Sequence, residues 1–108
     1  MKMKPLHCLL FAATLLASLP TRAEDHTIVQ KDREFSQTAI TVKPGEKVVF
    51  QNSDEVTHNV FSNSKINAFD LKTQKPGAAS EVTFSEEGTT EVRCAIHPKM
   101  KVIVTVKK

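Results

Sequence analysis

The chain has 108 residues, of which 25% are charged, and a formal net charge of +3 at pH 7. Three of its 15 basic residues lie before residue 24, so the 85 residues that follow carry 12 basic and 12 acidic side chains. A formally neutral domain argues against nucleic acid or an anionic membrane as a partner. A chain of this size supports one domain with one core.

Residues 1–23 are predicted to be a secretory signal peptide. Lys2 and Lys4 form a basic start, residues 8–19 are almost entirely apolar, and small side chains close the segment. This order is typical of a cleavable signal. The apolar run has 12 residues, fewer than the roughly 20 of a membrane helix, which leaves an uncleaved anchor as the weaker alternative. We therefore expect a periplasmic domain over residues 24–108, with no membrane insertion after cleavage.

The rest of the chain is rich in strand signals and has no long stretch with apolar residues at helical spacing. Strands are predicted at residues 27–30, 39–43, 47–51, 58–61, 81–84, 89–94 and 101–106. Pro then Gly at the centre of Lys43-Pro44-Gly45-Glu46 is typical of a type II turn, and Lys75-Pro76-Gly77-Ala78 predicts a second turn. About seven short strands at regular spacing predict an all-β sandwich.

Alternation within these strands predicts which side chains face the core. Val48 and Phe50 are expected to point inward, as are Val102, Val104 and Val106. Residues 63–79 are the least regular part of the chain. Phe69 and Leu71 are expected to anchor this part in the core, and a short helical turn near residues 66–71 is compatible with the sequence.

Removal of the first 23 residues leaves one Cys, Cys94, and one Met, Met100. A lone thiol cannot form an internal disulfide, and in an oxidising compartment it is at risk of oxidation. Metal ligation would explain its presence, and a buried structural Cys is the alternative.

The segment Cys94-Ala95-Ile96-His97-Pro98-Lys99-Met100 places a thiol, an imidazole and a thioether at every third position. Two His and one Cys, with a weak axial Met, form the blue-copper site. The missing imidazole is assigned to His58, in Thr57-His58-Asn59-Val60-Phe61-Ser62. Zinc also binds Cys and His and is the rival metal, but a Met ligand favours copper.

With these two segments the sequence resembles the cupredoxins, the small blue copper proteins, and is most similar to the amicyanin and plastocyanin members. The Cys-x2-His-x2-Met spacing is that of amicyanin, and the resemblance runs from about Phe35 to Val106. It implies a cupredoxin-like Greek-key β-sandwich of about seven to eight strands. It also implies one type 1 copper ion, with these ligands: His58, Cys94, His97 and Met100.

The resemblance also implies a role for each donor. Cys94 would supply the thiolate, His58 the buried imidazole and Met100 the weak axial sulfur. His97 would lie on a loop at the surface. The ion would join the two sheets.

Neighbouring residues would support the site. The edge of the loop imidazole would serve as the electron port, lined by Ile96 and Pro98. Asn59 would tie the His58 strand to the ligand loop by hydrogen bonds.

The predicted function is that of a monomeric, periplasmic carrier of single electrons that cycles between Cu(II) and Cu(I). Its partners would be redox proteins of unknown identity. A copper-buffering or copper-delivery protein with the same ligands is the alternative, although the chain has no Met-rich or His-rich tract. No enzymatic activity is expected. An oxidase or nitrite reductase needs further His clusters, and a Cys-His hydrolase needs an orienting group that is not evident.

His26 suggests a separate hypothesis. Cleavage after Ala23 would leave Glu24-Asp25-His26 at the N-terminus, where an amine, two amides and an imidazole could hold a square-planar Cu(II) or Ni(II). The alternative is an ordinary surface His on the first strand.

Overall fold

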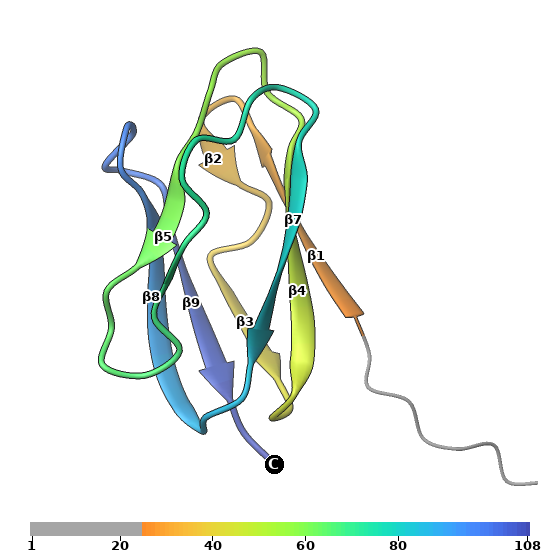
Figure 1. Ribbon diagram of the computed structural model, residues 1–108, viewed down its shortest axis with the longest axis vertical. Helices are drawn as coiled ribbons and strands as arrows, with labels where there is room; N and C mark the ends of the chain where they lie inside the picture. The colour runs from red at the N-terminus through yellow and green to blue at the C-terminus, as the bar shows by residue number, and fades with distance from the viewer. Residues whose placement is uncertain (1–24) are drawn as a thin grey trace, which may run out of the picture.

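The computed structural model describes residues 25–108, and within this range the chain forms nine strands and no helix (Figure 1). The strands are β1 (Asp25–Lys31), β2 (Glu34–Phe35), β3 (Ala39–Val42), β4 (Glu46–Asn52), β5 (Val60–Ser62), β6 (Phe69–Asp70), β7 (Ala79–Phe84), β8 (Gly88–Cys94) and β9 (Lys101–Val106). The described residues accordingly include no apolar helix with the length to cross a bilayer. The predicted signal peptide lies outside this range.

The strands form two sheets that face each other. The order is β2-β1-β4-β7 in the four-stranded sheet and β3-β9-β8-β5-β6 in the five-stranded sheet. The chain crosses repeatedly between the sheets, and two of the resulting pairs, β1 with β4 and β3 with β9, are parallel. The predicted Greek-key β-sandwich is therefore confirmed.

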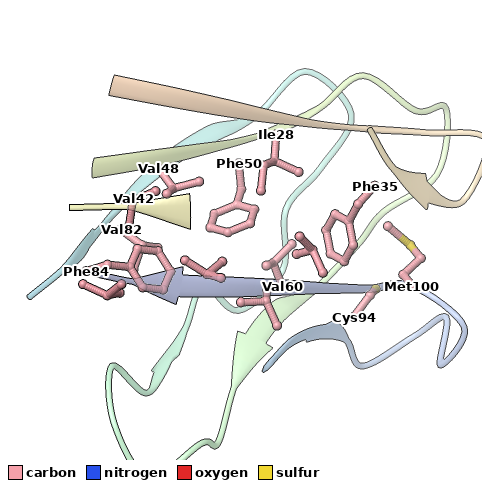
Figure 2. Packing of buried hydrophobic residues seen from close by; sticks show 14 residues of the cluster. Ile28, Phe35, Val42, Val48, Phe50, Val60, Val82, Phe84, Cys94 and Met100 are labelled. Carbon is pink, nitrogen blue, oxygen red and sulfur yellow. The ribbon is translucent and has the colours of Figure 1, made fainter. Parts of the chain in front are cut away.

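The core fills the space between the sheets (Figure 2). In β4 buried and outward-facing residues alternate, so that Val48 and Phe50 point inward as predicted. In β9 the buried residues are Val102, Val104 and Val106. The period of two along each strand thus follows directly from the sequence pattern.

Both predicted Pro-Gly turns are present. Gly45 has a φ of 92° and Gly77 a φ of 91°, the left-handed conformation that a type II turn requires at this position. The turn at residues 75–78 also brings the Gly77 amide to the Asn52 carbonyl, at 2.8 Å. This contact holds residues 72–78 against the end of β4.

The helical turn suggested for residues 66–71 is absent, and the segment bends into β6 instead. Asn67 adopts a left-handed φ of 54°, which interrupts a right-handed helix. Its side-chain oxygen accepts hydrogen bonds from the amides of Ser85 and Glu86, both at 3.1 Å. Phe69 stacks on Phe50 with ring centroids 5.7 Å apart, as expected of a core anchor.

Candidate metal centre

Three of the four predicted donors gather at one end of the five-stranded sheet. Cys94 is the last residue of β8 and pairs with Val60 in β5. His58 lies two residues before Val60, so the strand pairing brings it beside Cys94. His97 follows in the loop between β8 and β9. Two distant segments thus meet because β5 and β8 are neighbours.

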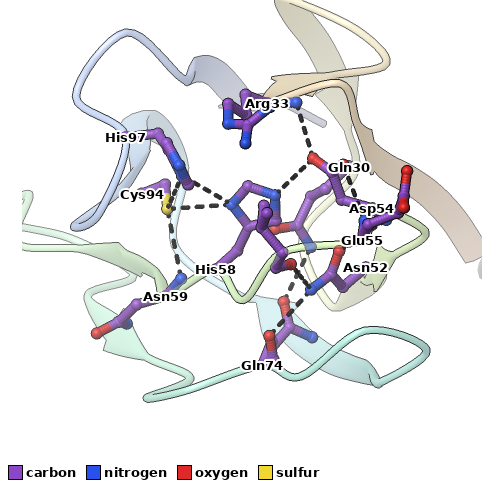
Figure 3. A network of polar contacts seen from close by, with 11 residues as sticks. Gln30, Arg33, Asn52, Asp54, Glu55, His58, Asn59, Gln74, Cys94 and His97 are labelled. Atoms are coloured by element: carbon purple, nitrogen blue, oxygen red, sulfur yellow. Dashed lines mark hydrogen bonds and ion pairs between the residues drawn. The ribbon is translucent and has the colours of Figure 1, made fainter.

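Figure 3 shows three side chains that converge on one point. The Cys94 sulfur lies 3.5 Å from Nδ1 of His58 and 3.9 Å from Nδ1 of His97, and the two Nδ1 atoms are 3.2 Å apart. Metal bonds of about 2.0 Å to nitrogen and 2.3 Å to sulfur would separate three donors in a plane by about 3.5–3.8 Å. The arrangement therefore fits a small ion with trigonal coordination.

Burial differs between the two imidazoles. His58 is fully buried, as is Cys94, whereas His97 is partly exposed. Burial lowers the pKa of His97, and the nearby positive charge of Arg33 lowers it further. A neutral imidazole keeps the lone pair that a metal needs. The surface position expected for His97 is thus only partly realised.

Met100 is 2% exposed and packs at the same end of the core as Cys94 (Figure 2). Its amide donates to the His97 carbonyl at 3.0 Å, which closes the loop into a tight turn. The position is compatible with a weak axial ligand, and that role stays a prediction.

Asn59 ties the two segments together, but mainly through its backbone. Its amide donates to the Cys94 sulfur at 3.3 Å, and its carbonyl accepts from the Ala95 amide at 2.9 Å. The Asn59 side chain instead donates to Asp70 Oδ1 at 3.0 Å. A separate contact, from the Arg93 guanidinium to the Pro98 carbonyl at 3.2 Å, steadies the loop.

A buried carboxylate next to His58 was not identified from the sequence. Asp54 Oδ2 lies 3.0 Å from Nε2 of His58 and accepts from the Arg33 amide at 2.8 Å. These hydrogen bonds hold the pKa of Asp54 well below its usual range. Residues 52–55 are uniformly polar, so only the four-residue spacing to His58 could have suggested the contact.

The expectation that the ion joins the two sheets is not met. Cys94 ends a strand of the five-stranded sheet, and His58 precedes another strand of that sheet. Protein contacts link His58 to the other sheet. Its ring contacts Asp54, which accepts from the Arg33 amide in the β1–β2 turn, and its backbone pairs with Gln74, whose side chain donates to the Phe50 carbonyl in β4.

Comparison with known proteins identifies the family. A family model described as copper-binding proteins of the plastocyanin/azurin family matches residues 23–107. The chain belongs to this family, the cupredoxins. The predicted resemblance is therefore confirmed, and the cofactor of this cupredoxin is copper, which the converging side chains of His58, Cys94 and His97 fit.

Individual relatives agree with this assignment. The cupredoxin is 29% identical over 91 residues to methylamine utilization protein MauL of Methylorubrum extorquens, covering 83% of this chain and 79% of that protein. Amicyanin from Paracoccus versutus is 27% identical, with a TM-score of 0.71 over 81% of this chain and 85% of that chain. A purple cupredoxin from Nitrosopumilus maritimus is 26% identical, with a TM-score of 0.69 over 76% and 99% of the two chains.

His26 is not part of this centre. It is partly buried in β1, and its Nε2 lies 2.9 Å from Glu46 Oε1. The hypothesis of a second site at residues 24–26 stays untested, because Glu24 lies outside the described residues.

Proposed function

We propose that this cupredoxin is a periplasmic, monomeric carrier of single electrons. Residues 1–23 would direct secretion, and residues 24–108 would form the mature domain. His58, Cys94, His97 and Met100 would hold one type 1 copper ion. The observation that carries the proposal is the convergence of two Nδ1 atoms and one sulfur, separated by 3.2–3.9 Å, at a buried end of the sandwich.

When bound, copper supplies a one-electron couple, and the protein supplies a fixed set of donors. The His58 side chain is enclosed and hydrogen-bonded, and backbone contacts hold Cys94. Donors held in this way cannot rearrange freely to suit one oxidation state, which favours fast electron transfer. The thiolate of Cys94 would contribute the strongest covalent bond.

The partly exposed His97 offers the path to a partner. Ile96 beside it is 50% exposed and is the exposed large hydrophobic residue of the described chain. A small apolar surface of this kind suits brief contacts with redox proteins. We expect no enzymatic activity, because both imidazoles near the thiol are assigned to the metal.

Expression of the full chain in a Gram-negative host tests the proposal. We expect the protein in the periplasmic fraction with Glu24 as its first residue. One copper per chain should give an intense visible absorption band from the thiolate to Cu(II), and voltammetry should show a reversible one-electron wave. Cys94→Ser should abolish the band. A colourless copper-loaded wild type would contradict the proposal.

The same preparation separates a carrier from a copper-handling protein. A carrier should keep its copper through repeated oxidation and reduction in the presence of a metal-free competitor chelator. Rapid transfer of copper to the chelator in each cycle would instead favour the delivery function.

A further inference from the structure

Beside the metal centre, the carboxylate of Asp54 forms a buried contact with the imidazole of His58. The two side chains are 6% and 0% exposed, and Asp54 Oδ2 lies 3.0 Å from Nε2 of His58. A carboxylate that also accepts two backbone amides, from Arg33 and Glu55, is an acceptor only. Nε2 of His58 must therefore carry a proton, and in the neutral imidazole the lone pair is then on Nδ1, which faces Cys94 and His97.

The Asp54 carboxylate is itself held on several sides. The Arg33 amide reaches it at 2.8 Å from the turn between β1 and β2, where Arg33 has a left-handed φ of 59°. The Asp54 amide donates to Oδ1 of Asn52 at 2.9 Å. Because the bond from Arg33 comes from the backbone, the carboxylate is fixed by the shape of the turn and not by the Arg33 side chain.

Asn52 links this carboxylate to the backbone of His58. It is fully buried, and its side-chain amide donates to the Gln74 carbonyl at 2.9 Å. Gln74 in turn pairs with His58 through two backbone hydrogen bonds of 3.0 and 2.7 Å. Asn52 therefore connects Asp54, which contacts the ring of His58, to Gln74, which pairs with the His58 backbone (Figure 3).

We propose that Asp54, oriented by Asn52 and the β1–β2 turn, is a positioning residue that fixes the Nε2–H tautomer of His58 and lowers the reduction potential of the centre. The inference rests on the proposed electron-carrier function. A buried negative charge is poorly screened by solvent and favours the oxidation state with the higher positive charge. A carboxylate on the far nitrogen also makes an imidazole a stronger donor.

The charge can be removed with little change in shape by Asp54→Asn. The amide oxygen can still accept from the Arg33 amide, so the turn keeps a partner. We expect the charge-transfer band to remain and the Cu(II) affinity to fall about 10- to 100-fold, with a smaller change for Cu(I). Each tenfold difference between the two affinities raises the potential by about 59 mV.

Asp70→Asn is the matched control. Asp70 is also an acid near the centre, but its side chain is 49% exposed and reaches it only through the side chain of Asn59. Removal of the Asp70 charge should leave the reduction potential close to that of the wild type. Equal potentials for Asp54→Asn, Asp70→Asn and the wild type would overturn the proposal.

A measurement on the wild type keeps the proposal testable if Asp54→Asn does not fold. In the metal-free protein, the ring 15N chemical shifts of His58 should show a protonated Nε2 and an unprotonated Nδ1. A predominant Nδ1–H tautomer would refute the role of Asp54. This result does not depend on copper, so it is separate from a failure of the electron-carrier function, which a missing charge-transfer band would reveal.

Discussion

Met100 has one observed role and one proposed role at the level of a single residue. Its side chain is buried with the core cluster, and it is also the expected weak axial donor. Leucine has nearly the same volume as methionine but offers no lone pair. This substitution therefore separates packing from ligation.

Met100→Leu should lower the free energy of unfolding of the metal-free protein by less than about 1.5 kcal/mol, because the volume is conserved. The copper-loaded variant should keep its charge-transfer band and have a higher reduction potential, since an electron donor to the oxidised ion is lost. Chemical denaturation and voltammetry check the two parts. An unchanged potential would show that the thioether is not a ligand.

The individual residues of the site differ in how far the sequence alone predicts them. Cys94, His97 and Met100 are evident because their donor atoms recur at a fixed spacing within one short segment. His58 is evident because few His residues remain after the motif is assigned. Asp54 was not predicted, because a polar loop has no periodicity that tells which of its side chains turns inward.

At the scale of elements, the loop between β8 and β9 is the proposed contact surface for redox partners. Within it, Ile96 is half exposed beside His97, and the Arg93 guanidinium holds the loop from the side. The hydrogen bond from Arg93 thus holds the loop in place, while the side chain of Ile96 is exposed to solvent and accessible to a partner.

Ile96→Asp should slow electron exchange between oxidised and reduced copies about tenfold or more. Burial of an apolar side chain contributes about 1.5–3 kcal/mol, and 1.4 kcal/mol corresponds to a factor of ten. NMR line widths of mixed Cu(I) and Cu(II) samples measure the rate. Thr83→Asp, on an exposed position of β7, should leave it unchanged. Equal rates in both variants would exclude Ile96 from the contact surface.

At the other end of the sandwich, two glycines have a positive φ, and substitution of each by alanine measures how much stability depends on this conformation. Gly45→Ala should destabilise the protein by about 1–2 kcal/mol, the cost of a left-handed conformation with a Cβ. Gly88→Ala should cost more, because the Gly88 φ of 134° lies farther than that of Gly45 from the left-handed region that a residue with a Cβ can occupy. Denaturant midpoints give both values, and a smaller loss for Gly88→Ala would contradict this ranking.

The elements themselves were largely predictable. Strands such as β4 and β9 have clear alternation, and the Pro-Gly turns specify their own geometry. The two-residue strands β2 and β6 were not predicted, because a pair of residues cannot show a period. Their pairing depends on neighbouring strands, which are distant in the sequence.

At the scale of the whole molecule, the two sheets are joined without help from the metal. Of the buried hydrophobic cluster, only Cys94 and Met100 belong to the proposed ligand set. The contacts between the sheets at the site end include hydrogen bonds of Asp54 and Gln74. The fold should therefore form before copper binds, with the donors already close together.

Removal of copper by a chelator under reducing conditions tests this independence. The far-UV circular dichroism should be unchanged, because the sheets and their core remain. The melting temperature should fall by about 10–20 °C, since copper at 100 times its dissociation constant adds about 2.7 kcal/mol and each kcal/mol shifts a domain of this size by about 4–8 °C. The melting temperature of Cys94→Ser, which lacks the thiolate, should change much less on removal of copper. Loss of the β-sheet spectrum on metal removal would mean that the ion, and not the protein core, holds the two sheets together.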